Sequence, residues 1–205
     1  LATRKKDIGK STPPGPIPFA SWDFVKGTRD LIGKLNLTLT GGAKVDNGVL
    51  MLDGHNAFAR SAPLNKDIAA KTLEAWVQLS NLNQRGGGVI SLQTRNGVLF
   101  DAVVYGERDP GQWMAGSNFH KRTQGFSAPA ESEANSSPVH LVIVYRSDGT
   151  ITGYRNGKPY GRSYKAEIQS FNAGDSEIIF GLRHGTRADS KRMLSGKILK
   201  ARLYD

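Results

Sequence analysis

The residues best suited to binding chemistry lie on one predicted strand and in the segments that follow it. Along Leu99–Glu107, the alternation of a β-strand places Asp101, Tyr105 and Glu107 on one face. An aromatic ring can cover the C–H face of a sugar, and carboxylates accept hydrogen bonds from its hydroxyl groups. We therefore predict a carbohydrate-binding set made of Asp101, Tyr105, Glu107, Trp113 and Arg122.

A structural role competes with this interpretation. Packing is the more common role for a tryptophan such as Trp113, and Glu107 can pair with Arg122 or Arg183 within the sheet layer. The segment Phe119–Pro138 is the longest stretch without periodicity, and long irregular loops in a compact domain often carry function. We expect this loop to form the rim of any binding site.

A second group lies in the sequence Gly181-Leu182-Arg183-His184-Gly185. The flanking glycines permit close backbone approach, and an Arg-His pair in a loop can orient a ligand carboxylate or hydroxyl. Arg183 and His184 therefore join the predicted binding set. A transition-metal site is not expected, because the chain has no cysteine and its four histidines are far apart.

Oxygen ligands for a hard cation are clustered near the start of the domain. Asp23, Asp30 and Asn36 fall in one glycine-containing loop, and carboxylate and amide oxygens suit calcium. The same residues suit Asx turns that stabilise a loop. Both interpretations, a calcium site and a set of turns, are open at this point.

Glycoside hydrolysis is the catalytic alternative, and it needs two carboxyl groups about 5–9.5 Å apart. Asp101 and Glu107 are six residues apart on one strand, which is roughly 20 Å at about 3.3 Å per residue. A dyad on that strand is therefore ruled out. A cross-strand pair such as Glu74 with Asp101 remains possible, but we predict that the chain is not an enzyme.

The elements that position these residues are predicted to be strands throughout. In Thr72–Leu79 the residues Leu73, Ala75, Val77 and Leu79 share one face, while Glu74, Trp76 and Gln78 share the other. Asn156-Gly157 suits a type I′ hairpin turn, and Asp148-Gly149 is taken as a turn of the same kind. We predict an all-β fold of two antiparallel sheets, a jelly-roll sandwich, with a closed barrel as the alternative.

Charge and composition divide the chain into a tail and one domain. There are 28 Lys and Arg against 18 Asp and Glu, a net charge of +10, and the excess concentrates in residues 1–10 and 183–202. Because the body is nearly neutral, nucleic acid is not the expected partner. The Pro-rich segment up to Phe19 predicts a linker over residues 1–19 and a domain over 20–205.

Several short motifs, in order, carry a resemblance to a known family. They are Asp23-Phe24, Leu50-Met51-Leu52-Asp53-Gly54, Thr72-Leu73-Glu74-Ala75-Trp76-Val77, Asp148-Gly149-Thr150-Ile151, Tyr154-Arg155-Asn156-Gly157 and Phe180-Gly181-Leu182-Arg183. The chain resembles the laminin G-like (LamG-like) domains of the concanavalin A-like lectin/glucanase superfamily. Within them it looks closest to a bacterial, planctomycete-type branch found in large exported multidomain proteins.

The resemblance implies a jelly-roll sandwich that binds glycans or protein surfaces, often with a structural calcium ion near the chain ends. The Glu-x-Asp-x-Glu motif of the related glucanases is absent. We therefore expect a non-catalytic binding module of a larger exported protein, joined covalently to other domains. It would recognise carbohydrate or a protein surface in the periplasm, on the cell surface or outside the cell. The alternatives are a structural spacer domain and, less favoured, a glycoside hydrolase.

No membrane insertion is expected, because no apolar run approaches the roughly 18 residues that a spanning helix needs. The chain does not begin with Met and has no apolar signal core in Leu1–Lys10. We therefore expect it to be an excised or processed piece of a longer protein.

Overall fold

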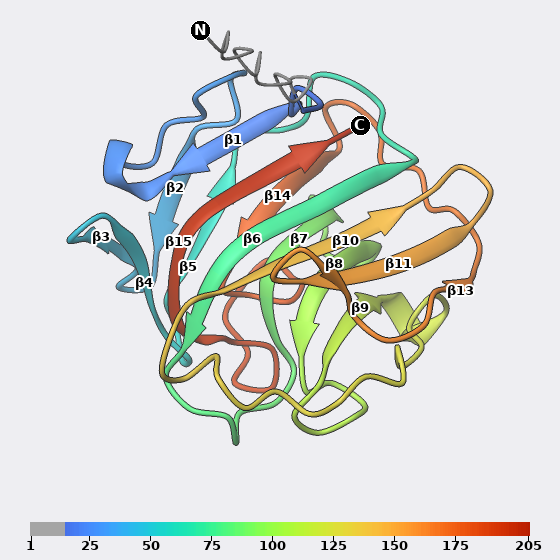
Figure 1. The fold of residues 1–205 in the computed structure, drawn as a ribbon. Helices are drawn as coiled ribbons and strands as arrows, with labels where there is room; N and C mark the ends of the chain where they lie inside the picture. The colour runs from blue at the N-terminus through green and yellow to red at the C-terminus, as the bar shows by residue number, and fades with distance from the viewer. Residues whose placement is uncertain (1–14) are drawn as a thin grey trace, which may run out of the picture.

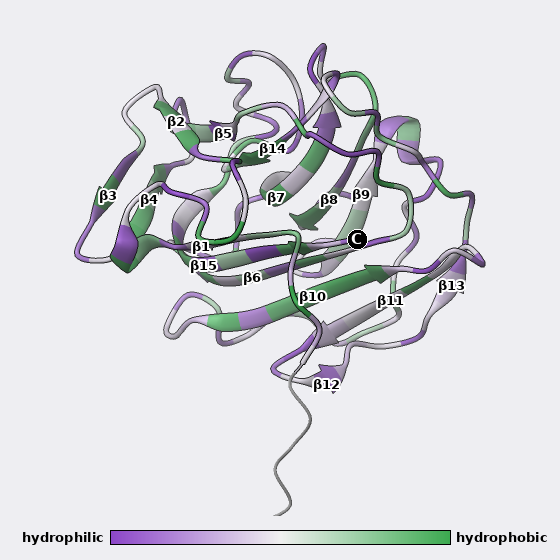
Figure 2. Ribbon diagram, turned by 90° about the horizontal axis from the view of Figure 1, so that it is seen from above, coloured by the Kyte–Doolittle hydropathy of each residue, from purple (hydrophilic) through white to green (hydrophobic). Residues whose placement is uncertain are grey.

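The computed structural model describes residues 15–205, which form two antiparallel sheets packed face to face (Figures 1 and 2). The predicted all-β, two-sheet antiparallel jelly-roll sandwich is confirmed, and the two separate sheets exclude a closed barrel. The first strand begins at Ala20, and residues 1–14 of the predicted linker lie outside the described residues.

Sheet A is the nine-stranded layer at the front of Figure 1. Its strands are β1 (Ala20–Asp23), β3 (Lys44–Asp46), β4 (Val49–Asp53), β6 (Lys71–Leu79), β10 (Val139–Tyr145), β11 (Thr150–Arg155), β12 (Lys158–Pro159), β13 (Tyr164–Lys165) and β15 (Ser195–Tyr204). The main path runs β12-β11-β10-β6-β15-β4-β3, with β1 on β15 and β13 on β11.

Sheet B is the six-stranded layer behind it, in the order β2-β5-β14-β7-β8-β9. Its strands are β2 (Leu37–Thr40), β5 (Phe58–Ser61), β7 (Gly87–Thr94), β8 (Phe100–Tyr105), β9 (Trp113–Ser117) and β14 (Ser176–Phe180). Two single turns of 3-10 helix, η1 (Phe24–Lys26) and η2 (Asn118–His120), complete the elements of residues 15–205.

The alternation predicted for β6 is confirmed. Its apolar residues Leu73, Ala75, Val77 and Leu79 are buried between the sheets, which anchors this strand between β10 and β15. Burial of each of the larger side chains, Leu73, Val77 and Leu79, stabilises the fold by about 1.5–3 kcal/mol. Figure 2 shows the two layers from above, with apolar strand segments in both sheets.

The two predicted turns differ in outcome. Asn156 and Gly157 both have positive φ, 50° and 76°, as the predicted type I′ turn between β11 and β12 requires. In the other turn Gly149 has positive φ (82°) but Asp148 does not, so the expectation of a second turn of this kind is wrong. There the Asp148 carboxylate accepts hydrogen bonds from Thr150 N and Oγ1 instead (both 2.9 Å).

The two sheets are joined by a buried ionic cluster. Lys71 of β6 and Asp101 of β8 both point between the sheets, with Lys71 Nζ 2.9 Å from Asp101 Oδ2. Arg122 donates from Nε to the other carboxylate oxygen at 2.8 Å. Burial lowers the pKa of Lys71, and the charge of Asp101 opposes that effect. One carboxylate therefore compensates two buried cations.

This cluster generates the first prediction. Asp101→Asn keeps the shape but leaves Lys71 and Arg122 without a counter-charge, so we expect the free energy of unfolding to fall by about 3–5 kcal/mol. Urea unfolding measures it. Asp46→Asn, which removes an exposed pair with Lys44, is the control and should cost under about 1 kcal/mol. Equal effects of the two substitutions would contradict the role given to Asp101.

Candidate functional site

Four of the predicted binding residues lie in the interior. Asp101 and Tyr105 are 0% exposed, Trp113 is 1% and Arg122 is 3%. The predicted alternation of β8 is correct, but the face that carries Asp101 and Tyr105 points toward sheet A. Their predicted position on a ligand-facing surface is therefore contradicted. The opposite face of β8 is buried too, so a period of two could not tell which face looks inward.

Glu74 and Trp76 lie on the outer face of sheet A, on the other side of the molecule from the outer face of sheet B. Glu74 accepts hydrogen bonds from Tyr204 Oη (2.8 Å) and Arg202 Nη1 (3.3 Å) and contacts His140 Nε2 at 2.7 Å. Because Asp101 faces inward from sheet B, the cross-strand carboxylate pair Glu74 with Asp101 does not exist.

The other three predicted residues, Glu107, Arg183 and His184, come together on the outer face of sheet B. Glu107 Oε1 lies 2.9 Å from Arg183 Nη1, so the pairing considered from the sequence is present. His184 stacks on the outward ring of Phe100, with ring centroids 4.1 Å apart and planes 7° apart. Two loops, residues 118–121 and 183–192, lie over this face and cover the outward side chains of β8.

A hollow of about 800 Å³ opens between these loops and the turn after β7. Its lining includes Asn96, Val98, Phe119, His184, Arg187 and Arg192. Phe119 is 82% exposed and holds a left-handed backbone conformation, with φ 51° and ψ 25°. A large aromatic side chain in that conformation costs energy, so the surrounding contacts must impose it. We call this space the Phe119 hollow.

The segment that carries Phe119 is held by Arg122. The guanidinium donates from Nη2 to Phe100 O (3.0 Å) and to Asn118 Oδ1 (2.8 Å), and Arg122 N donates to Ser117 Oγ (2.8 Å). These hydrogen bonds fix Asn118 and Arg122 against strands β8 and β9, and the residues between them turn outward. Arg122, predicted to touch ligand, acts instead by positioning its neighbours.

The 183–192 loop is clamped by Gln93 and by a glycine contact. Gln93 Oε1 accepts from Gly185 N (2.8 Å), and Gln93 Nε2 donates to Gly185 O (3.1 Å). Gly97 approaches so closely that a Cβ there would lie 2.4 Å from Gly185 Cα. The loop therefore sits in a fixed place against the turn after β7.

His184 has a defined protonation state in this loop. Its Nδ1 lies 2.9 Å from Gly97 O, and because a carbonyl oxygen only accepts, Nδ1 carries the proton. Burial lowers the pKa of His184 to about 4, although the Gly97 hydrogen bond opposes this. At neutral pH the ring is uncharged, and Nε2 is a hydrogen-bond acceptor.

A smaller hollow of about 330 Å³ adjoins the first, since its lining continues from Phe119 to His120 and from His184 to Arg183. The other lining residues are Arg85, Gly86, Glu107 and Lys191. Within the described residues, Glu107 Oε2 and Arg183 Nε are buried and have no hydrogen-bond partner. Those two atoms are covered, but the exposed lining residues Arg85, His120 and Lys191 are polar, so this hollow is suited to a polar ligand.

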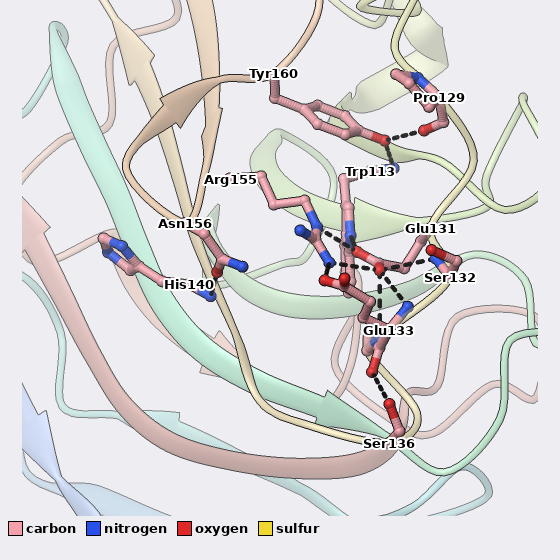
Figure 3. Close-up of polar contacts among 11 residues, drawn as sticks. Trp113, Pro129, Glu131, Ser132, Glu133, Ser136, His140, Arg155, Asn156 and Tyr160 are labelled. Atoms are coloured by element: carbon pink, nitrogen blue, oxygen red, sulfur yellow. Dashed lines mark hydrogen bonds and ion pairs between the residues drawn. The ribbon is translucent and has the colours of Figure 1, made fainter.

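The long loop predicted as the rim is fixed at its far end by Glu131. Figure 3 shows Trp113 and Arg155 converging on this carboxylate, which accepts from Trp113 Nε1 (2.6 Å), Arg155 Nε (2.8 Å) and Arg155 Nη2 (2.8 Å). Backbone N–H groups of residues 132–134 also donate to it. Burial alone would raise the pKa of Glu131, but the hydrogen bonds from Arg155 and Trp113 outweigh it and lower the pKa to about 2.

Sequence patterns did not single out Phe119, Arg187, Arg192 or Glu131. Each lies in a loop without periodicity, where alternation gives no information. A usable signal exists for Phe119, which is an isolated aromatic residue between two polar ones in the sequence Asn118-Phe119-His120. For Arg187 and Arg192 it is the high charge of the glycine-flanked loop.

The family model described as the concanavalin A-like lectin/glucanases superfamily, of laminin G type, matches residues 52–205, about three quarters of the chain. The chain belongs to this superfamily. A search of curated proteins finds no match to this laminin G-like domain.

Solved structures show the same fold at low sequence identity. Domain 4 of AbnA, a GH43 extracellular arabinanase from Geobacillus stearothermophilus solved in complex with arabinotriose, is 17% identical with a TM-score of 0.66, and 91% of each chain is covered. The Emp47p carbohydrate recognition domain is 13% identical with a TM-score of 0.54, covering 91% of this chain and 95% of that one. A Trypanosoma rangeli sialidase is 15% identical with a TM-score of 0.60, but only 33% of its chain is covered.

The residues predicted to bind calcium do not fit that ion in this laminin G-like domain. Asp30 Oδ1 accepts from Ser21 N and Ile32 N, and Asp30 Oδ2 accepts from Leu35 N, all at 3.0 Å. Asn36 Oδ1 accepts from Asp30 N. Asp23 caps η1 at Val25 N and pairs with Lys200 at 3.0 Å. These oxygens face N–H donors, as the alternative of Asx turns predicts.

Within residues 15–205, no group of three or more histidine, aspartate or glutamate side chains could hold a metal ion. In the same part of the chain, no helix is long and apolar enough to span a membrane.

The Glu131 anchor predicts a pH-dependent stability. Its folded pKa lies below the ordinary value of 4.5, so its stabilising contribution is complete above about pH 4.5 and is lost as the pH falls toward 2. We expect Glu131→Gln to lower the free energy of unfolding by about 3 kcal/mol at pH 6 and by much less near pH 2.5. Urea unfolding at both pH values measures it.

Glu133→Gln is the matched control, because Glu133 also binds Arg155 but its side chain is 60% exposed. We expect it to change the free energy of unfolding by under about 1 kcal/mol at either pH. If the effect of Glu131→Gln were the same at pH 6 and pH 2.5, the carboxylate would not be the anchor.

Proposed function

We propose that this chain is a non-catalytic carbohydrate-binding module of a larger exported protein, with its saccharide bound in the Phe119 hollow. The observation that carries the proposal is the exposed Phe119 ring beside the polar lining of that hollow. An aromatic face covers sugar C–H groups, while His184 Nε2, Asn96 and the two arginines of the lining supply hydrogen bonds to hydroxyl groups.

Binding is favoured over hydrolysis by the state of the acidic groups in these hollows. A general acid must hold a proton near neutral pH. Glu107 is paired with Arg183 at 2.9 Å, and Asp189 is paired with Arg192 at 3.3 Å, so each carboxylate is already engaged by a cation. Neither carboxylate is therefore free to serve as the general acid.

The similar structures support the same class of function. The arabinanase domain was solved with arabinotriose, and the Emp47p domain is named a carbohydrate recognition domain. That arabinanase is described as extracellular, which supports an exported location and a place beside other domains for this chain. A structural spacer domain is the alternative, and it predicts no saccharide binding.

Phe119→Ala tests the proposal. Affinity electrophoresis against arabinan, β-glucan, galactan and polygalacturonate gels identifies a ligand, and calorimetry then measures its affinity. We expect Phe119→Ala to weaken binding about tenfold or more, since removing one apolar side chain from a contact costs about 1.5–3 kcal/mol. Because the side chain is 82% exposed, the fold should be unaffected.

Val25→Ala is the matched control, since Val25 is an apolar side chain that is 69% exposed in η1, away from the hollow. We expect it to bind as the parent does. If the parent protein bound none of the polysaccharides, the proposal would be contradicted and the spacer role favoured. Unchanged binding by Phe119→Ala would place the site elsewhere.

A further inference from the structure

A third hollow continues from the Phe119 hollow along the outer edge of sheet B. It has a volume of about 680 Å³, and Asn96 lines both spaces. Its lining includes Lys34, Asn36, Thr38, Arg60, Arg95 and Glu177. We call it the Arg60 hollow. A ligand longer than the Phe119 hollow would pass Asn96 and enter this space.

The Arg60 hollow is positively charged, with three cations against one carboxylate. The carboxylate of Glu177 is only 5% exposed and is already engaged, because Oε1 lies 3.0 Å from Arg60 Nη2 and accepts from Gln93 Nε2 at 2.9 Å. The negative charge is therefore covered and paired, while Lys34 and Arg95 are exposed.

These cations have unused capacity for an anion. Within residues 15–205, Lys34 and Arg95 are exposed and form no ion pair, whereas Arg60 is paired with Glu177 through Nη2. Guanidinium and ammonium groups bind carboxylates and sulfates through charge-assisted hydrogen bonds, which are stronger than neutral ones. Lys34 and Arg95, which have no internal partner beside Arg60, are therefore suited to an external oxyanion.

We propose that the saccharide carries an anionic group, a carboxylate or a sulfate ester, which is bound in the Arg60 hollow by Lys34, Arg60 and Arg95. This inference rests on the proposed function and specifies its ligand as an acidic polysaccharide. The neutral part of the polysaccharide contacts Phe119, and its charged group lies beyond Asn96. A single-stranded nucleic acid is less suitable, because such partners stack several bases on several aromatic rings. The two hollows expose one such ring, Phe119.

The test uses pairs of polysaccharides that differ only in charge. Polygalacturonate is compared with its methyl ester, and a sulfated galactan with the same galactan after desulfation. We expect the parent protein to bind at least one charged polymer about tenfold more tightly than its neutral partner. The two pairs distinguish a carboxylate from a sulfate. Single-stranded DNA is included as a control polyanion, because its binding would report attraction by charge and not recognition of a saccharide by Phe119.

The variant Lys34→Gln/Arg95→Gln removes two exposed cations of the Arg60 hollow without breaking an internal ion pair. We expect it to lose the preference for the charged polymer and to bind the neutral partner within about twofold of the parent. Lys44→Gln/Lys165→Gln is the matched control, since it removes the same charge from exposed positions on sheet A. It should keep the preference.

The outcomes separate this inference from the proposed function. Equal binding of charged and neutral polymers would overturn the acidic ligand and leave a carbohydrate-binding module. Equal losses in the two double variants, or DNA binding as tight as that of the charged polysaccharide, would show attraction by net charge alone and overturn it too. If no polysaccharide binds, both the inference and the proposed function fail.

Discussion

The Asp101 carboxylate is the constraint on which the rest of the binding face depends. It compensates Lys71 from sheet A and Arg122 from the loop after β9, and all three side chains are buried. Removing two cations from water is expensive, and one carboxylate in contact with both offsets that cost only in a fixed geometry. Arg122 is thereby fixed beneath η2, and Phe119 is held outward in a conformation that a free chain would avoid.

The outer face of sheet B is a base for loops rather than a solvated surface. Gln93, Phe100 and the close approach of Gly97 to Gly185 hold the 183–192 loop against the strands. Glu131 holds the other long loop through Trp113 and Arg155. With the loops fixed at buried points, the hollows between them are preformed, so a ligand does not pay to order them.

The fold was predictable from the sequence because alternation and turn residues report directly on strands. β6 and the Asn156-Gly157 turn are confirmed in detail. The orientation of β8 was not predictable, because loops bury its outer face as well, and Phe100, Ala102 and Val104 look as apolar as a core face. The alternation therefore predicts a ligand surface for Tyr105, which lies in the interior. Arg183 and His184 could be grouped from the sequence because their loop carries its own glycine and charge pattern. Glu107 comes from the predicted strand instead, and it meets Arg183 because it lies beyond the end of β8.

Amide chemical-shift mapping with a short oligogalacturonate tests whether a saccharide binds on the outer face of sheet B. We expect perturbed amides to cluster at residues 95–98, 118–120 and 184–192. Amides of the outward residues Trp76 and His140 on sheet A should be unaffected. Perturbations centred on sheet A, or none on the outer face of sheet B while the oligosaccharide binds, would contradict it.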